Sequence, residues 1–270
     1  MDIEQGSIIF GLKSKKYPEQ PCYGIVITAS CDIANQKVEE IYYVTAVNVK
    51  DWLFSKLGHA LVIKHKRQGL YDKIRQQVCS QQLDESLLVN FTLDEVKKVI
   101  DETVANAKTR EDILSDINKY LNLISNDTIE KRKSDVQLYS RDCSKLLEQI
   151  GKGDHYRYVY LTEQAYLANT KKDDGLIVDF QEINCLSIEQ MRQVVDGQID
   201  YMVQKDHFDN LQKLQLNFWV KNENDFAMVY SKISSPWREH LMQRFAHYFT
   251  RIGLDGAETQ DYKKISEKIK

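Results

Sequence analysis

Residues 21–47 read PCYGIVITASCDIANQKVEEIYYVTAV, and this stretch decides which fold the chain is expected to adopt. The runs 23–29 and 41–47 are dense in β-branched and aromatic residues, which favour extended strands. The connection between them is polar and carries Cys31, Asp32 and Lys37. The stretch therefore predicts two paired strands joined by a loop that carries a thiol, a carboxylate and an amine.

Further strand signals lie near the N-terminus and in the second half of the chain. A β-branched run follows Gly6, and the runs YRYVYL at 156–161 and LIVDF at 176–180 are rich in strand-forming residues. Between these two regions, residues 51–154 space their apolar side chains as a helix does. The pattern predicts a sheet whose strands are interrupted by a helical block.

Two sequence signals mark helix starts. Thr92 is followed by Glu95, and Ser187 is followed by Gln190, which is the spacing of a capping box. In such a box the hydroxyl and the longer side chain bond each other's backbone N–H groups. We therefore expect one helix to begin inside the helical block and another directly after the strand that starts near residue 176.

The last part of the chain predicts a β-hairpin followed by an amphipathic helix. The runs 214–220 and 226–233 flank KNEND, whose Asn and Asp residues favour a turn. In SSPWREHLMQRFAHYFTRIGL, Ser235 suits the N-cap, Pro236 the first helical position and Gly253 the helix end. We expect this helix to pack an apolar stripe against the rest of the protein.

Composition excludes several classes of protein. The chain has 37 basic and 40 acidic residues, so its formal net charge of −3 creates no general attraction for nucleic acid. No apolar run approaches the roughly 18 residues of a membrane span, and the N-terminus lacks a signal-peptide pattern. The five cysteines are scattered and form no CxxC pair. We expect a cytoplasmic protein with reduced thiols and no contact with a membrane.

Cofactor and metal motifs are also missing from the sequence. The six histidines show no HxH or HExxH spacing, and neither GxxxxGK[ST] nor GxGxxG occurs. We expect no metal and no cofactor. The basic runs KHKR at 64–67 and KRK at 131–133 are typical of solvated helix faces, and we expect that role for both.

The N-terminal pattern resembles that of the MazF/PemK/CcdB-like toxins. It consists of QGSIIF, a polar loop ending in proline, an apolar strand, a loop with asparagine, and a strand ending VTAV. Residues 6–49 contain most of the resemblance, and GLIVDFQEINCLSIEQM at 175–191 is similar to a later strand and helix of that family. The resemblance implies an α+β protein with an SH3-like β-barrel interrupted by a helical insertion.

On this resemblance the barrel is split between residues 1–50 and 155–195. Residues 51–154 form the helical insertion, and 196–270 form the C-terminal β-hairpin and amphipathic helix. Family members that cut single-stranded RNA use an Arg before the loop-ending proline and a Thr or Ser after the strand pair. Gln20 and Asn48 occupy these positions here, and they supply neither the fixed charge nor the hydroxyl. The resemblance therefore implies a barrel used for binding, as in the CcdB-like members that bind a topoisomerase.

Two groups of residues are candidates for chemistry or binding. Cys31 beside Asp32 could form a nucleophilic site with Lys37, although a neighbouring carboxylate raises a thiol pKa. The alternative, which we favour, is that Cys31 packs as a small apolar residue while Asp32 caps the loop. The second group is a basic row at helical spacing in the last helix, which could hold phosphates or lie solvated: His240, Arg244, His247 and Arg251.

Two functions follow as hypotheses. The first is a bacterial toxin–antitoxin or phage-defence type protein that uses the barrel as a binding or regulatory module. Its partner would be a protein, such as an antitoxin, an ATPase or a defence-complex subunit, or else RNA or DNA. The alternative is a ribonuclease-like toxin that cuts single-stranded RNA with relocated catalytic residues.

Overall fold

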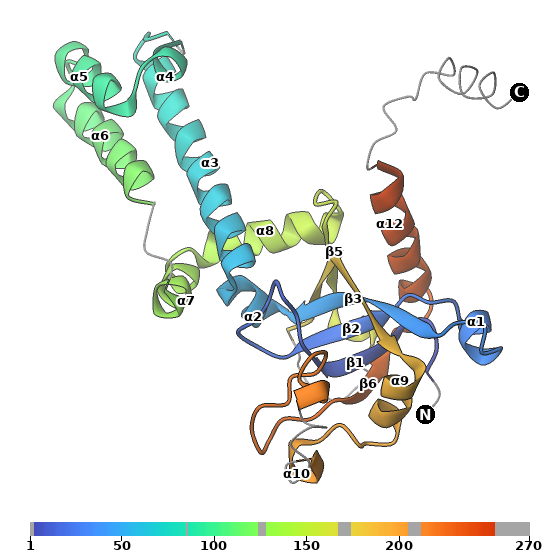
Figure 1. The fold of residues 1–270 in the computed structure, drawn as a ribbon. Coiled ribbons are helices and arrows are strands. Elements are labelled where there is room, and N and C mark those ends of the chain that lie inside the picture. Colours follow the sequence, from blue (N-terminus) through green and yellow to red (C-terminus); the bar gives the residue numbers. More distant parts are fainter. Residues whose placement is uncertain (1–2, 85, 124–127, 167–173, 205–211, 252–270) are drawn as a thin grey trace, which may run out of the picture. The chain divides into compact units, whose positions relative to one another are not determined.

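The two strands expected within residues 21–47 form and pair with each other in the computed structural model of the protein (Figure 1). They are β2 (Cys22–Val26) and β3 (Glu40–Asn48), antiparallel, with Ile25 opposite Val44. The connection between them contains a short helix, α1 (Ser30–Ala34). The structure describes residues 3–84, 86–123, 128–166, 174–204 and 212–251, without the side chain of Arg251.

These strands lie in a six-stranded antiparallel sheet with the order β4-β5-β3-β2-β1-β6. β4 and β6 are its edges, and among the described strands none pairs the two edges, so the sheet is open. The α+β class expected from the sequence is confirmed. The remaining strands are β1 (Ser7–Leu12), β4 (Tyr158–Leu161), β5 (Leu176–Ser187) and β6 (Met228–Lys232).

The chain divides into two units. The sheet unit comprises Met1–Asp51 and Gln149–Lys270, and the helical unit comprises Trp52–Glu148. The helical unit contains α3 (Lys56–Ser80), α4 (Ser86–Asn90), α5 (Leu93–Thr103), α6 (Ala107–Asn122) and α7 (Ile129–Leu138). Two more helices cross the boundaries in sequence, α2 (Val49–Phe54) and α8 (Ser140–Lys152).

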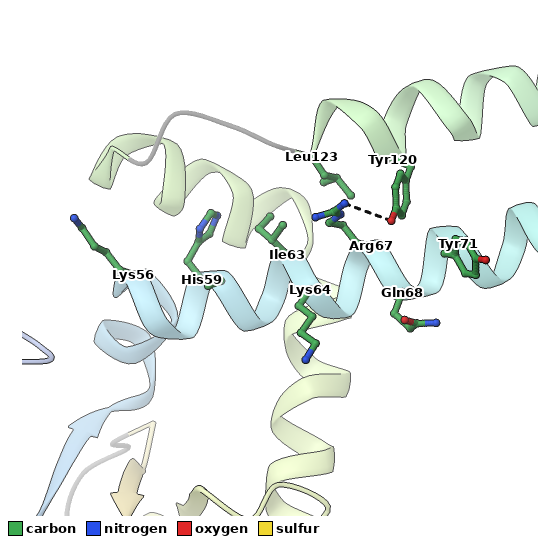
Figure 2. A pocket seen from close by; sticks show the side chains of 10 residues that line it. Lys56, His59, Ile63, Lys64, Arg67, Gln68, Tyr71, Tyr120 and Leu123 are labelled. Atoms are coloured by element: carbon green, nitrogen blue, oxygen red, sulfur yellow. Dashed lines mark hydrogen bonds between the residues drawn. The ribbon is translucent and has the colours of Figure 1, made fainter. Parts of the chain in front are cut away.

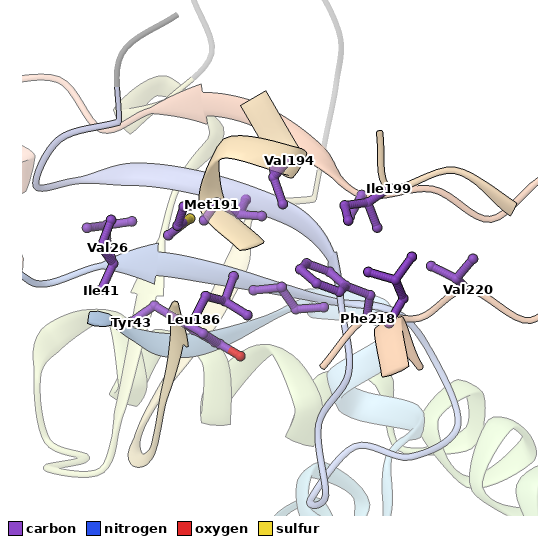
Figure 3. Packing of buried hydrophobic residues seen from close by; sticks show 13 residues of the cluster. Val26, Ile41, Tyr43, Leu186, Met191, Val194, Ile199, Phe218 and Val220 are labelled. Carbon is purple, nitrogen blue, oxygen red and sulfur yellow. The ribbon is translucent and has the colours of Figure 1, made fainter. Parts of the chain in front are cut away.

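Successive strand residues point to opposite faces of the sheet. An apolar cluster covers each face, and neighbouring strand residues belong to different clusters. Ile9 contributes to a cluster with Met191 and Val194 of α9 (Ile188–Val195), which Figure 3 shows packed beside Val26 of β2. The neighbouring Ile8 belongs to a second cluster that includes Leu241 of α12 (Trp237–Arg251). Two short elements complete the described part of this unit: η1 (Glu163–Ala165) and α10 (Tyr201–Gln204).

The helical unit has its own apolar core, formed by α3, α5 and α6 with the neighbouring α4. Ile74 of α3, Ile100 of α5 and Ile113 of α6 are fully buried in one cluster. The capping box expected at Thr92 is present at the start of α5, with Thr92 Oγ1 accepting from the Glu95 backbone N–H. The second box, Ser187 with Gln190, is present at the start of α9.

The expected β-hairpin at 214–220 and 226–233 is wrong. β6 pairs with β1, with Val229 opposite Ile9, and 214–220 forms a helical turn and an irregular segment. The Phe218 N–H donates to the Leu214 carbonyl at 2.9 Å, and Leu216 between them is 74% exposed. Leu214 and Phe218 therefore share a face through the four-residue spacing of a helix, and the two-residue alternation does not apply. The turn chemistry expected at Asp225 is present, since its carboxylate accepts from the backbone of Lys221 and Asn222.

Candidate nucleic-acid interface

Cys31 and Asp32 are adjacent in α1, and both lie at the surface of the sheet unit. Cys31 is exposed, so the expectation that it packs as a small apolar residue is wrong. Its thiol donates to Asp32 Oδ1 at 3.6 Å. Lys37 is joined to Asp32 through its backbone N–H, while its side chain makes no polar contact with the described residues. Among the described residues, no cation or imidazole contacts the Cys31 thiol to activate it.

The basic row of α12 is split by its environment. His240 and His247 are exposed, whereas Arg244 is half-buried and its Nη2 donates to the His155 carbonyl at 3.5 Å. Its guanidinium also lies against Gly153, and burial lowers the pKa of Arg244 below its ordinary value. Arg251 ends the helix, and its side chain lies outside the described part. Arg244 thus contacts a chain turn and does not join the two histidines in one open row.

A polar network that the sequence did not suggest anchors the loop between β1 and β2. Asp179 of β5 is fully buried and accepts two hydrogen bonds from Arg157, at 2.8 and 2.6 Å, and one from the Tyr17 hydroxyl at 3.0 Å. Burial and Asp179 raise the pKa of Tyr17, so the hydroxyl stays protonated and donates. Burial would lower the pKa of Arg157, but the bonds to Asp179 raise it above its ordinary value.

The nearby Ser14 and Glu182 have the same anchoring role. The Ser14 hydroxyl donates to Glu182 Oε1 at 2.6 Å and accepts from the backbone N–H groups of Lys16 and Tyr17. All of its hydrogen-bonding capacity is therefore used within the loop, which removes it as a nucleophile. Asn48 accepts from the Lys50 N–H, and Gln20 Nε2 is enclosed without a partner among the described residues.

The helical unit presents the most basic element of the described structure, helix α3. It contains six Lys and Arg residues and one acidic residue, Asp72. Ser55 caps its start by accepting from the Gly58 N–H at 3.1 Å. A Cβ atom at Gly58 would clash with the Trp52 carbonyl oxygen, so only glycine permits this close approach of α2 and α3. The local sequence thus fixes where the basic helix begins.

A hollow of about 840 Å³ lies along α3, α6 and the start of α8, and we call it the basic groove. Five basic and two acidic side chains line it, an excess of three positive charges. Lys73 and Lys119 both contact the buried Asp116, at 2.6 and 3.2 Å. The lining consists of Lys66, Gly69, Leu70, Lys73, Asp116, Lys119, Asn122, Leu123, Leu138, Tyr139, Arg141, Asp142 and Lys145.

Two cations of the basic groove have no carboxylate partner among the described residues. Arg141 and Lys145 are exposed on successive turns of α8, whereas Lys66 pairs with Asp142 at 3.1 Å. Burial would raise the pKa of Asp116, but hydrogen bonds from Lys73 and Lys119 outweigh it and hold that pKa below its ordinary value. Both acidic groups of the groove are thus paired with lysines, and Arg141 and Lys145 are left as exposed positive charges.

A second hollow of about 600 Å³ lies between α3 and the end of α6, and we call it the Arg67 hollow. Figure 2 shows Arg67 reaching from α3 toward Tyr120, while Lys64 and Gln68 extend from the other side of the helix. The Arg67 guanidinium lies 4.9 Å from the Tyr120 ring centroid, and its Nη2 donates to the Tyr120 hydroxyl at 3.4 Å. The lining consists of Lys56, His59, Ala60, Ile63, Lys64, Arg67, Gln68, Tyr71, Tyr120 and Leu123.

Comparisons with known proteins returned no match to a family model, to a curated protein or to a solved structure. Among the described residues, no three His, Cys, Asp or Glu side chains gather as metal ligands would. None of the described helices has the length and apolar character needed to cross a membrane. The functional assignment therefore depends on the geometry and charge of the site itself.

Proposed function

We propose that this chain is a nucleic-acid-binding protein of toxin–antitoxin or phage-defence type, and that its helical unit contacts the phosphates. The basic groove supports this function most directly, because its lining has five basic and two acidic side chains. Lys and Arg that neutralise phosphates supply the sequence-independent part of nucleic-acid affinity. A chain with a net charge of −3 needs such a local concentration of positive charge to bind a polyanion.

The sheet unit would then be a module that supports binding and performs no chemistry of its own. We propose that its six-stranded sheet is an opened variant of an SH3-like barrel, in keeping with the β1-β2-β3 meander and the return of β5 beside β3. The positions where the toxin family keeps its catalytic Arg and hydroxyl are Gln20 and Asn48. Five cysteines without a disulfide favour the cytoplasm as the compartment.

The direct test measures binding of the full chain to single-stranded RNA, single-stranded DNA and duplex DNA by fluorescence anisotropy. We expect affinity to fall steeply with salt, because each phosphate contact to a single strand adds about −0.7 to the slope of log K against log salt. Reversing the two charges without a carboxylate partner, Arg141→Glu with Lys145→Glu, should weaken binding at least about tenfold. It should also make the slope of log K against log salt shallower by about 1 to 1.5.

The matched control is Lys98→Glu with Lys108→Glu, which makes the same change in net charge on exposed positions of α5 and α6 outside the groove. Its affinity should stay within about threefold of the native chain, since exposed charges beyond a Debye length are largely screened. Equal losses in both double variants would contradict a specific groove. Absence of nucleic-acid binding at low salt would instead point to a protein partner, such as an antitoxin or an ATPase.

The same assay tests the ribonuclease alternative. Cleavage of single-stranded RNA that disappears in Cys31→Ala or in Arg244→Ala would favour relocated catalytic residues. We expect no such cleavage, because Cys31 lacks an activating partner and the Arg244 guanidinium contacts the turn at Gly153.

A further inference from the structure

The Arg67 hollow differs from the basic groove because the Arg67 guanidinium is held in one orientation by Tyr120. Stacking on Tyr120 fixes the plane of the Arg67 guanidinium, and the bond from Nη2 to the Tyr120 hydroxyl fixes its rotation. Among the described residues that bond is the only one its five N–H groups make. An arginine held in one orientation with unused donors is preorganised for a planar, multidentate acceptor such as a phosphate.

The charge around Arg67 selects an anion. The lining of the hollow contains Lys56, Lys64, Arg67 and His59 but no carboxylate. The buried Asp135 contacts His59 of that lining at 3.0 Å, and Lys131 contacts the same carboxylate at 2.6 Å. The Asp135 charge is therefore already compensated and does not oppose the positive field of the hollow.

Arg67 also carries an unmet donor. Its Nε is buried and has no hydrogen-bond partner within the described residues. A buried donor without a partner is destabilising, so an acceptor that bonds this donor would remove the cost of leaving it unpaired.

The position of the hollow connects it to the basic groove. The two hollows share Leu123, the residue that caps the end of α6. A strand whose phosphates follow the groove therefore reaches the Arg67 hollow at one end. Apolar side chains, Ala60, Ile63 and Leu123, line the hollow there and offer no further phosphate contacts.

We propose that the Arg67 hollow binds a phosphate monoester, and that in the nucleic-acid complex this group is the terminal phosphate of the strand. This inference rests on the proposed function. A monoester carries about −1.5 to −2 charges at neutral pH, compared with −1 for an internal diester, and so gains more from Arg67 and Lys56 together. Inorganic phosphate and free nucleoside monophosphates present the same chemistry, so they are alternative sources of the group.

The test uses the full chain and compares one single-stranded oligonucleotide carrying a 5′-phosphate, a 3′-phosphate or hydroxyl ends. We expect one of the two phosphorylated ends to bind at least about fivefold tighter than the hydroxyl-ended strand, as an added charge-assisted contact would give. Arg67→Met, which keeps the length of the side chain against Tyr120, should abolish that difference while leaving the salt slope of the groove almost unchanged. Arg67→Lys should retain only part of it, because lysine lacks the fork.

Two further arms keep the outcomes separate. Lys56→Gln should reduce the preference for a phosphorylated end without removing it, and circular dichroism would verify that each variant is folded. If inorganic phosphate or a nucleoside monophosphate raises the melting temperature of the native chain but not of Arg67→Met, while strand ends make no difference, the hollow takes a free phosphate ester. Equal binding of all three strands together with no effect of phosphate would overturn the inference, whereas salt-dependent binding in the same assay would leave the proposed function intact.

Discussion

Asp179 shows at the scale of a single residue how the loop between β1 and β2 is anchored. Its carboxylate is fully buried and is shared by Arg157 and Tyr17. Such a group costs free energy to desolvate, and the hydrogen bonds around it offset that cost. Removing one partner of a network of this kind leaves the other charge uncompensated.

We therefore predict that Asp179→Ala lowers the free energy of unfolding by about 3–5 kcal/mol, because Arg157 would lose its partner inside the structure. Urea unfolding followed by circular dichroism measures this. The control is Asp174→Ala, whose carboxylate pairs with Lys50 at 2.7 Å but is exposed, and which should cost no more than about 1 kcal/mol. Similar losses in the two variants would show that the Arg157–Asp179 contact has no special weight.

Asp116 gives a prediction about pH. Its pKa lies below the ordinary value in the folded protein because Lys73 and Lys119 donate to it against the effect of burial. A lowered pKa in the folded state stabilises the protein above the pKa of the unfolded chain, and this stabilisation is lost as pH falls through the folded-state pKa. Asp116→Asn should therefore cost about 1–3 kcal/mol at pH 7.

The difference between Asp116→Asn and the native chain should shrink as pH falls below about 4, where the unfolded carboxyl becomes protonated. Urea unfolding at three pH values between neutral and acidic conditions would measure it. Asp112→Asn on the same helix is the matched control, since Asp112 is exposed and makes no ion pair with the described residues. If the stability difference between Asp116→Asn and the native chain stayed constant across the pH range, the lowered pKa of Asp116 would be contradicted.

At the scale of elements, helix caps are the features whose contribution can be isolated. Thr92 begins α5 and exchanges hydrogen bonds with Glu95, and both residues are exposed. Thr92→Ala removes the hydroxyl that accepts from the Glu95 backbone N–H. It should lower the free energy of unfolding of the helical unit by about 1 kcal/mol.

The control for Thr92→Ala is the same substitution at Thr103, in the last turn of α5. The Thr103 hydroxyl donates to the Val99 carbonyl four residues earlier, so it caps no N–H group. Thr103→Ala should be neutral or slightly stabilising, because alanine has the higher helix propensity. Hydrogen exchange of the first-turn amides of α5 would report the loss locally, and unchanged protection in Thr92→Ala would argue against the cap.

Elements with strong local signals could be predicted from the sequence. Both capping boxes are present where the sequence predicts them, and β2 and β3 end within a few residues of their expected bounds, because these signals act between neighbouring residues. The prediction of the hairpin was wrong because strand pairing depends on residues that are far apart in the sequence. Leu214, Leu216 and Phe218 alternate as a strand would, but β6 pairs with β1, and Phe218 makes only an isolated bridge to Leu12 at the end of β1. Residues 214–220 otherwise form a turn that buries Leu214 and Phe218.

The candidate interface could not be predicted in the same way, because its parts are brought together only by helix packing. Arg67 and Tyr120 are 53 residues apart in sequence, and the run that contains Arg67 is typical of a solvated face. The charge of the basic groove depends on which acidic residues face it, namely Asp116 and Asp142. A basic run in the sequence does not show which acidic residues will pair with it or which aromatic side chain will lie beside it.

At the scale of the whole molecule, each unit has a core of its own. The two clusters that cover the sheet consist of residues from the sheet unit, and the cluster around Ile74, Ile100 and Ile113 consists of residues from the helical unit. The basic groove and the Arg67 hollow are likewise lined by residues of the helical unit alone. Folding and phosphate binding should therefore be separable from the sheet.

We predict that a fragment covering residues 49–152, which keeps α2 and α8 whole, folds alone and binds single-stranded nucleic acid within about threefold of the full chain at the same salt concentration. Its length of about 100 residues lies in the range in which domains fold independently. A cooperative thermal transition followed by circular dichroism would establish folding, and anisotropy would establish affinity. The same fragment with Arg141→Glu and Lys145→Glu should lose the affinity but keep the transition. A folded fragment without affinity would mean that the sheet unit supplies phosphate contacts, and the groove would then account for only part of the binding.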